Sequence, residues 1–138
     1  MHLELRNDIR ELATAMGALQ DFARSTDLDK GASQAAELVL DELLSNIMRH
    51  GHTADGGQRI TLDLDVCEGS LHIRISDGGI PFNPFDRPPP NLDLPIDQRE
   101  PGGLGIHLVR HFMDDYSYCY QDKRNVVTLR KDLAPDTT

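Results

Sequence analysis

The sequence predicts an α+β fold, a two-layer α/β sandwich with helices on one face of a mixed or antiparallel sheet. Three observations predict it. The segments follow the order β-α-α-β-β-loop-α-β-β, the two central strands have a hairpin pattern, and the strand–helix–strand alternation of a parallel sheet does not occur. The 138 residues, 38% hydrophobic and 27% charged, fit one ordinary globular domain over residues 1–138.

The N-terminal segment predicts a strand followed by a helix. Residues 3–6 are a short strand candidate, and Asp8 and Glu11 have the spacing of a capping box. The apolar residues that follow recur at helical spacing, which predicts a buried stripe. Its expected members are Ile9, Leu12, Ala13, Met16, Leu19 and Ala23.

A second helix is expected from about residue 30 to residue 50. Asp27 and Asp29 can cap its first turn, and Gly51 is placed to end it. Its expected buried stripe is Ala36, Val39, Leu40, Leu43 and Ile47.

The remaining segments predict strands, a long loop and a third helix. Apolar and polar residues alternate over 60–66 and over 71–75, which is typical of a hairpin with one buried face. Seven of the eight prolines lie in residues 77–103, where neither a helix nor a central strand can continue. Beyond this loop we expect a helix over 103–113 and two strands over 116–121 and 124–131.

Composition excludes several classes of protein. The net charge of −9 repels a phosphate backbone, so direct nucleic-acid binding is not expected, although one nucleotide can still bind in a local pocket. The N-terminus does not read as a signal peptide, and no stretch has the roughly 18 apolar residues of a membrane helix. Cys67 and Cys119 lie in strand-like runs and are expected to be buried, reduced thiols of a cytoplasmic protein without membrane contact.

The first candidate site lies on the second helix, where Glu42, Asn46 and His50 are spaced one turn apart. At about 100° per residue, Asn46 is about 60° and Glu42 about 100° from the buried Leu43. A carboxylate and an amide on this edge suit a metal or proton-handling site, although a solvated helix flank gives the same spacing. His50 is expected to interact with the last carbonyls of the helix.

The second and third candidate sites are rich in glycine. Asp77 follows a strand and precedes Gly79, so its carboxylate can accept a hydrogen bond from an exocyclic amine while the backbone passes close to a flat ring; a simple tight turn is the alternative. Residues 102–105 carry three glycines where a helix is expected to begin, which allows an anion to approach free amides; an ordinary helix cap is the alternative.

Taken together in this order, the three segments resemble the nucleotide-binding boxes of the GHKL (Bergerat-fold) superfamily. Within it the chain is similar to the anti-sigma-factor serine/threonine protein kinases. The likeness runs through Leu-Asp-Glu-Leu-Leu-Ser-Asn-Ile-Met-Arg-His-Gly (40–51), Ser-Asp-Gly-Gly-Ile-Pro-Phe-Asn-Pro (76–84), Gly-Gly-Leu-Gly-Ile-His-Leu-Val-Arg (102–110) and Asn-Val-Val-Thr-Leu (125–129).

The resemblance implies a role for each matching residue. Glu42 would be the catalytic base for the attacking hydroxyl, Asn46 would coordinate Mg²⁺, and Asp77 would bind the adenine amino group with Gly79 allowing the ring to approach. Thr128 would help to hold the adenine edge through water. The remaining implied nucleotide-binding residues, at the glycine-rich helix start, are Gly103, Leu104, Gly105 and Ile106.

The resemblance also implies a function. Residues 80–102 would form an ATP lid, and the ligands would be ATP or ADP with Mg²⁺. Such relatives phosphorylate a serine of an anti-sigma-factor antagonist and sequester a sigma factor, and many are homodimers. Two departures bear on catalysis: Pro81 stands where the wider superfamily often has glycine, and the lid lacks lysine, with Arg87 and Arg99 as its basic residues.

Two other functions remain possible from the sequence. A non-catalytic module that switches partners in response to ATP or ADP would need the same nucleotide pocket, and detection of phosphate on a partner separates it from a kinase. A histidine-kinase ATPase domain is less favoured because no helical hairpin carrying a phosphoacceptor histidine precedes residue 1.

Two further patterns are given structural readings. His107 and His111 have a spacing that can bind zinc, but no neighbouring carboxylate completes the zinc-protease motif, so surface histidines are expected. Tyr116, Tyr118 and Tyr120 alternate along a strand and are expected to share one face of the sheet.

Overall fold

The computed structural model describes residues 1–50, 59–86 and 103–133, and within them the element order is the predicted one. In chain order the elements are β1 (His2–Arg6), a 3-10 turn (Ile9–Glu11), α1 (Leu12–Ser25), α2 (Lys30–His50), β2 (Arg59–Cys67), β3 (Ser70–Asp77), a second 3-10 turn (Pro84–Asp86), α3 (Gly103–Phe112), β4 (Asp115–Gln121) and β5 (Arg124–Asp132).

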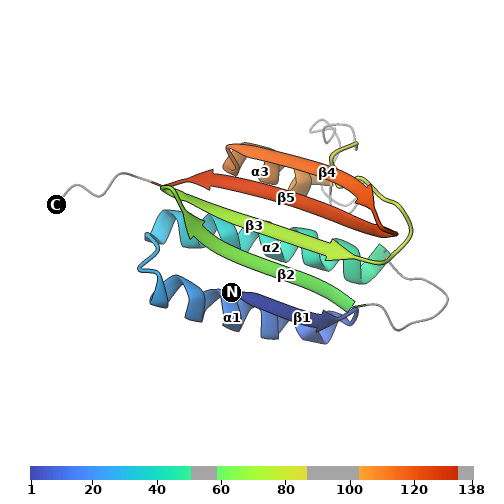
Figure 1. Ribbon diagram of the computed structural model, residues 1–138, viewed down its shortest axis with the longest axis horizontal. Helices are drawn as coiled ribbons and strands as arrows, with labels where there is room; N and C mark the ends of the chain where they lie inside the picture. Colours follow the sequence, from blue (N-terminus) through green and yellow to red (C-terminus); the bar gives the residue numbers. More distant parts are fainter. Residues whose placement is uncertain (51–58, 87–102, 134–138) are drawn as a thin grey trace.

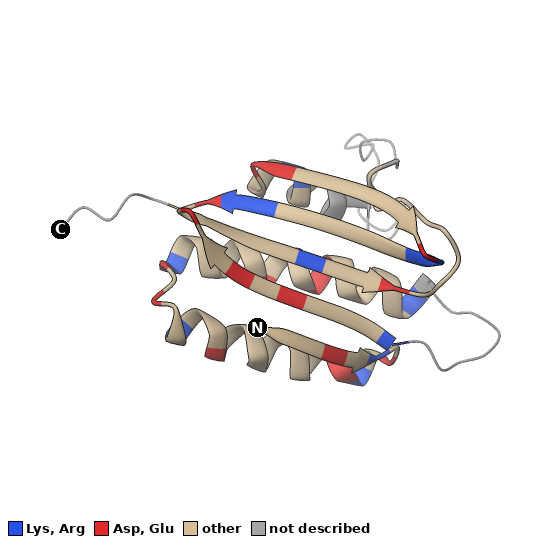
Figure 2. Cartoon of the chain, in the orientation of Figure 1, with Lys and Arg blue, Asp and Glu red and all other residues tan. Residues whose placement is uncertain are grey.

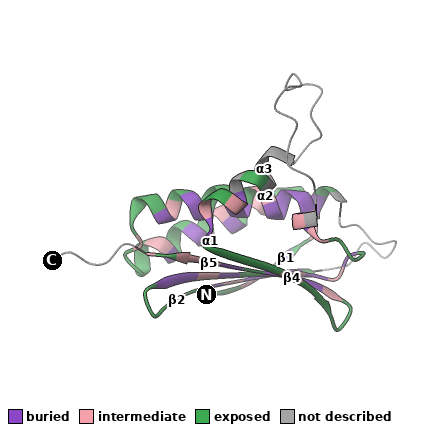
Figure 3. Ribbon diagram, turned by 90° about the horizontal axis from the view of Figure 1, so that it is seen from above, coloured by how far each residue is buried: buried purple, intermediate pink, exposed green. Residues whose placement is uncertain are grey.

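The strands form one sheet in the order β1-β2-β3-β5-β4, and every neighbouring pair is antiparallel. Of the two sheet types expected, the antiparallel one is therefore confirmed for the described strands. The three helices lie together on one face of this sheet, so the molecule has the predicted two layers (Figures 1 and 3). None of the helices in the described ranges has the length and apolar character needed to cross a membrane.

The hydrophobic core lies between the helices and the sheet. Alternate residues of the strands point to the helices, as a pleated strand requires, and those from β2 and β3 are almost fully buried. The largest fully buried side chains are Leu5, Leu19, Leu40, Leu44, Ile60, Leu62, Leu64, Leu71, Ile73, Ile75 and Leu129. The alternation predicted for 60–66 and 71–75 is thus confirmed.

The strand residues that alternate with the buried ones point to the other face of the sheet, and on β2 and β3 they include Asp63, Asp65 and Arg74, with charges of both signs (Figure 2). None of the described helices covers this face (Figure 3). The Arg124 guanidinium spans three strands on this face. It donates to the Arg59 carbonyl on β2 at 3.0 Å and to the Ser76 carbonyl on β3 at 3.2 Å. These bonds tie together the ends of β2, β3 and β5, where β3 ends at Asp77.

Helix α2 begins and ends where the sequence predicts. The Asp29 carboxylate accepts a hydrogen bond from the Ala32 amide at 2.8 Å, which satisfies a donor in the first turn. The expected stripe faces the core: Ala36, Val39, Leu40 and Leu43 are at most 2% exposed, and Ile47 packs against them while partly buried.

In helix α1, the residues that face the core are not all the predicted ones. Ile9 is 51% exposed and Ala13 is also exposed, whereas Ala15, Leu19 and Phe22 are buried. The cause lies in Asp8, which accepts from the Arg10 amide and pairs with its guanidinium at 2.6 Å, lowering the pKa of the Asp8 carboxyl to about 2. Residues 9–11 consequently form a tighter 3-10 turn, and the regular helix starts only at Leu12.

Both cysteines are free, but the expectation that they are buried is wrong. Cys67 and Cys119 are exposed. Cys67 ends β2 one residue after the inward-facing Val66, so it points away from the helices. Cys119 lies opposite Val126 on β4, which forms the edge of the sheet and is exposed over most of its length.

Candidate functional site

Asp77 ends β3 in the middle of the sheet and faces the helices. It pairs with Ile60 of β2 and Asn125 of β5, and it is only 5% exposed. Its Oδ2 accepts from the Gly79 amide at 2.9 Å and from the Asn125 amide nitrogen at 3.3 Å. Burial raises the pKa of the Asp77 carboxyl, and the two hydrogen bonds partly oppose this rise.

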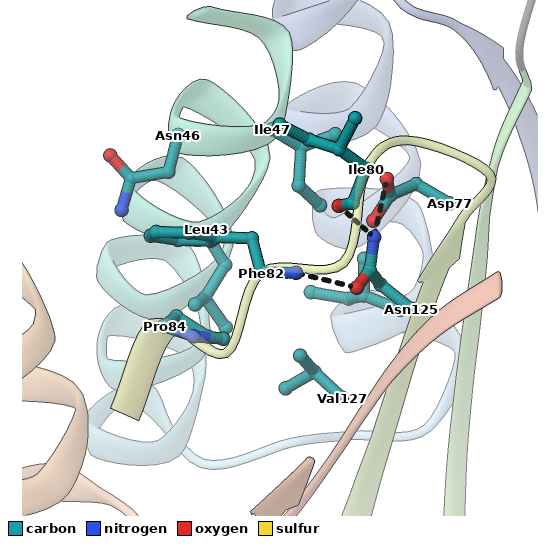
Figure 4. A pocket seen from close by; sticks show the side chains of 10 residues that line it. Leu43, Asn46, Ile47, Asp77, Ile80, Phe82, Pro84, Asn125 and Val127 are labelled. Carbon is teal, nitrogen blue, oxygen red and sulfur yellow. Dashed lines mark hydrogen bonds between the residues drawn. The ribbon is translucent and has the colours of Figure 1, made fainter. Parts of the chain in front are cut away.

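Asn125 connects Asp77 to the segment that follows it. Its Nδ2 also donates to the Ile80 carbonyl at 2.9 Å, and its Oδ1 accepts from the Phe82 amide at 3.0 Å. The Tyr118 hydroxyl donates to the same Oδ1. One buried side chain therefore fastens residues 79–82 to the sheet beside Asp77 (Figure 4).

A largely apolar pocket opens between α2 and the sheet next to these groups (Figure 4). Three parts of the chain line it: the end of α2, the neighbouring strands β3 and β5, and the segment after Asp77. The lining residues are Leu43, Asn46, Ile47, Ile75, Asp77, Ile80, Phe82, Pro84, Asn125 and Val127. The arrangement offers an apolar slot with a carboxylate and an amide at one end, as expected for a flat heterocycle.

Asn46 lines the same pocket from α2, across from Asp77 and Asn125 (Figure 4). It is 5% exposed, and its Nδ2 lies 3.3 Å from Oε1 of Glu42, one turn earlier. Arg49, one turn later, approaches Asn46 Oδ1 at 3.5 Å and donates to the Ser45 carbonyl. The predicted association of Glu42 and Asn46 on one helix edge is thus present, with a guanidinium beside it.

The two glycine-containing candidate segments lie beside described elements. Gly79 directly follows the Asp77 turn, where its amide contacts the carboxylate. Gly103 begins α3, so Leu104, Gly105 and Ile106 form its first turn, where amides lack partners within the helix. The expected ATP lid falls partly in residues 87–102, including Arg87 and Arg99, which lie outside the described residues.

The described start of that segment is anchored a second time at Phe85. The Phe85 carbonyl accepts a hydrogen bond from the Arg110 guanidinium of α3, and its ring lies 4.8 Å from the Tyr116 ring of β4. The Asn83 side chain accepts from the Phe85 amide at 2.9 Å. Residues 79–86 therefore form a wall of the pocket that is attached both to the sheet and to α3.

The expectation for Thr128 is wrong. Thr128 is exposed and pairs with Arg74 and Ser117, all on the sheet face that points away from the helices and the pocket. Asn125, three residues earlier, points to the helix-covered face of the sheet and lies against Asp77. Sequence reasoning missed it, although alternation back from the inward-facing Leu129 and Val127 identifies residue 125 as facing the helices.

The remaining candidates lie outside this pocket. His107 and His111 are exposed on α3, as expected for surface histidines. In the described part of the chain, no three histidine, cysteine or acidic side chains gather as a metal cluster. Tyr116, Tyr118 and Tyr120 do share one face of the sheet, since they pair with Leu129, Val127 and Asn125 in turn.

Comparison with known families and proteins gives one consistent result. The family model described as the histidine kinase-like ATPase domain matches residues 5–131. The serine/threonine-protein kinase BtrW of Bordetella bronchiseptica is 35% identical over 100 residues, covering 72% of this chain and 70% of that protein. The serine-protein kinase RsbW of Listeria innocua is 25% identical over 114 residues, covering 80% and 73%.

Solved structures share the fold. The RsbU and RsbW domains of a Mycobacterium tuberculosis protein match 99% of this chain with a TM-score of 0.69 at 14% identity, and the chain covers 33% of that structure. The histidine kinase AdeS of Acinetobacter baumannii matches with a TM-score of 0.54 at 16% identity. The match covers 98% of this chain and 68% of the AdeS chain.

Proposed function

Because this chain belongs to the histidine kinase-like ATPase domain family, we propose that it binds ATP and transfers the terminal phosphate to a serine of a partner protein. The observation that carries this proposal is the pocket that Asp77 and Asn46 line from opposite sides, with Glu42 in contact with Asn46. The relatives are named serine- and serine/threonine-protein kinases, which supports protein kinase activity.

The base of the nucleotide is assigned to the Asp77 end of the pocket. Both hydrogen bonds that reach Asp77 from the described residues go to Oδ2, so Oδ1 is available to accept from an exocyclic amine. The apolar side chains Leu43, Ile75 and Val127 line the slot in which the ring would lie. Gly79 has no side chain to obstruct the ring at the turn.

The phosphates are assigned to the Asn46 end and to the first turn of α3. Amides at the start of a helix attract anions, and Gly103 and Gly105 allow close approach there. Asn46 carries an amide oxygen and lies one turn from the Glu42 carboxylate on the same edge of α2, and oxygens of these kinds fit Mg²⁺ held by one or two protein oxygens together with phosphates. When bound, Mg²⁺ would neutralise charge on the phosphates.

Glu42 is proposed as the base. The serine oxygen of the partner would attack the γ-phosphorus while its proton passes to the Glu42 carboxylate, and the bond from the γ-phosphorus to the bridging oxygen would break to release ADP. Asn46, one turn along α2, would position the phosphates of the nucleotide next to the Glu42 carboxylate.

The proposed partners are supported by the similarity to the named kinases, since the structure describes no interface with another protein. We propose that the phosphorylated protein is an anti-sigma-factor antagonist, that the chain also sequesters a sigma factor in the cytoplasm as an anti-sigma factor, and that it forms a homodimer. The net charge of −9 supports protein partners rather than nucleic acid. The family match over 5–131 supports a single ATP-binding domain over residues 1–138.

The second candidate function is a nucleotide-gated module that switches partners without transferring phosphate. It is favoured by the contacts of Asn46, whose Oδ1 faces Arg49 at 3.5 Å and whose Nδ2 faces Glu42 at 3.3 Å. A metal ligand would have to give up the first of these contacts.

The deciding experiment incubates the protein with radiolabelled ATP, Mg²⁺ and candidate antagonist proteins encoded near its gene. A kinase gives phosphoserine on one antagonist and releases ADP. Tight ATP binding without label on any antagonist would support the switching module instead. Absence of ATP binding would overturn both functions.

A further inference from the structure

The side-chain amide of Asn125 has only one orientation compatible with its neighbours. The Phe82 N–H, 3.0 Å from Oδ1, can only donate, and the Ile80 carbonyl, 2.9 Å from Nδ2, can only accept. Exchanging the two ends of the amide would place donor against donor and acceptor against acceptor. Nδ2 is therefore the end that faces Asp77.

Tyr118 adds a second donor to the oxygen end of this amide. Because Asn125 Oδ1 can only accept, the Tyr118 hydroxyl must donate. Burial raises the pKa of this hydroxyl, so it keeps the proton that the bond requires. Tyr118 comes from β4 and Asn125 from β5, so this bond joins two neighbouring strands of the sheet.

The orientation of Asn125 fixes what Asp77 can offer to a ligand. The amide nitrogen of Asn125 and the Gly79 amide both donate to Oδ2, and each favours the ionised carboxylate. An ionised carboxylate only accepts hydrogen bonds, so Oδ1, which accepts none from the described residues, pairs with an amine and repels a carbonyl.

We propose that Asn125 determines the nucleobase specificity of this pocket by keeping Asp77 an obligate acceptor, with Tyr118 as the positioning residue for Asn125. The site then selects 6-amino purines over 6-oxo purines. This inference rests on the nucleotide binding proposed above, and it adds two residues to which the sequence analysis assigned no role at the site.

Substitution of either residue changes the choice of base rather than only the affinity. Asn125→Asp replaces the donor facing Asp77 with a second carboxyl oxygen, and two neighbouring carboxylates retain a shared proton. A protonated Asp77 can donate to a 6-oxo group. Tyr118→Phe removes one of the two donors that orient the amide, so its effect is in the same direction and smaller.

The experiment measures the affinities of ATP and ITP, which differ in the group at purine position 6, by calorimetric titration. For the wild-type protein we expect ATP to be preferred on the order of 10²-fold, since a carbonyl would leave the buried carboxylate unpaired. The preference should fall roughly tenfold in Asn125→Asp and about threefold in Tyr118→Phe. Tyr120→Phe is the matched control, because Tyr120 lies on the same strand and face and is 46% exposed.

The ratio of the two affinities separates the possible results. A loss of folded structure weakens both nucleotides equally and leaves the ratio unchanged, and Tyr118→Phe carries the test if Asn125→Asp does not fold. An unchanged ratio in folded Tyr118→Phe, or an equal change in Tyr120→Phe, would overturn the inference while ATP binding stands. A wild-type protein that binds neither nucleotide would instead overturn the proposed function.

Discussion

Asp77 and Asn125 lie directly opposite each other on β3 and β5, and their side chains meet at 3.3 Å although 48 residues separate them in the sequence. Both face the helices in the middle of the sheet and both are 5% exposed. The polar end of the pocket is therefore part of the buried layer, and its geometry is set by strand pairing.

Asp77→Asn should weaken ATP binding. Asparagine can present its nitrogen to the exocyclic amine, and loss of a hydrogen bond to a charged group costs about 1.5–3 kcal/mol. Titration with a fluorescent ATP analogue measures the change, with circular dichroism as the check on folding. Unchanged affinity in a folded variant would remove Asp77 from the site.

The same substitution should leave the ligand-free fold at least as stable at neutral pH. Burial raises the pKa of Asp77 above its unfolded value, so the ionised carboxylate is less favourable in the native state than in the unfolded chain. The corresponding stability is present below the unfolded pKa of about 3.8 and is lost as the pH rises through the higher folded value. Ionised Asp77 thus opposes folding at neutral pH, and Asp77→Asn removes that penalty.

Urea unfolding of the wild type and Asp77→Asn at several pH values tests this sign. The stability of the variant relative to the wild type should increase from pH 4 to pH 7.5. A relative stability that decreases over this interval would mean that Asp77 has a lowered pKa.

Glu42→Ala and Asn46→Ala should separate chemistry from binding. Without Glu42 we expect phosphoserine formation to fall by roughly 10²–10⁴-fold, the usual contribution of a positioned base, with little change in ATP affinity. Without Asn46, Mg²⁺-dependent ATP binding should weaken and transfer should fall with it. The measurements are ATP affinity and phosphoserine on the antagonist.

Asp41→Ala is the control for Glu42, since Asp41 is the preceding residue on α2 and is exposed. It should transfer phosphate at the wild-type rate. If Glu42→Ala also does so, the proton is taken by another group.

Thr128→Val should leave ATP affinity within about twofold of the wild type, because Thr128 points away from the pocket and surface changes are usually nearly neutral. The same titration applies. A tenfold loss would show that the outer face of the sheet influences the base site.

The sequence predicted the parts of the site that depend on local spacing. Glu42 and Asn46 are one helical turn apart, and the Asp29 cap fixes where α2 begins, so their shared edge follows from the pattern. Asp77 comes directly at the end of a segment with alternating apolar and polar residues, so the sequence placed it at the end of a strand. These features need no knowledge of tertiary contacts.

The features that were missed depend on pairing between distant segments. Val126 and Val127 are both buried although they face opposite sides of the sheet, which obscures the alternation that identifies Asn125 and excludes Thr128. Ile9 was misplaced because the Asp8–Arg10 pair holds a 3-10 turn before α1. Neither the pairing of β5 with β3 nor the Asp8–Arg10 ion pair can be read from the spacing of apolar residues.

The division of the pocket between two layers also has a consequence for folding. Glu42 and Asn46 come together through contacts local to one helix, whereas Asp77 and Asn125 meet only after β3 and β5 have paired. A partly folded chain with its helices formed could hold the first pair and still lack the second. Nucleotide would then bind only the completed fold, and by mass action the cellular pool of ATP would hold newly made chains in that state.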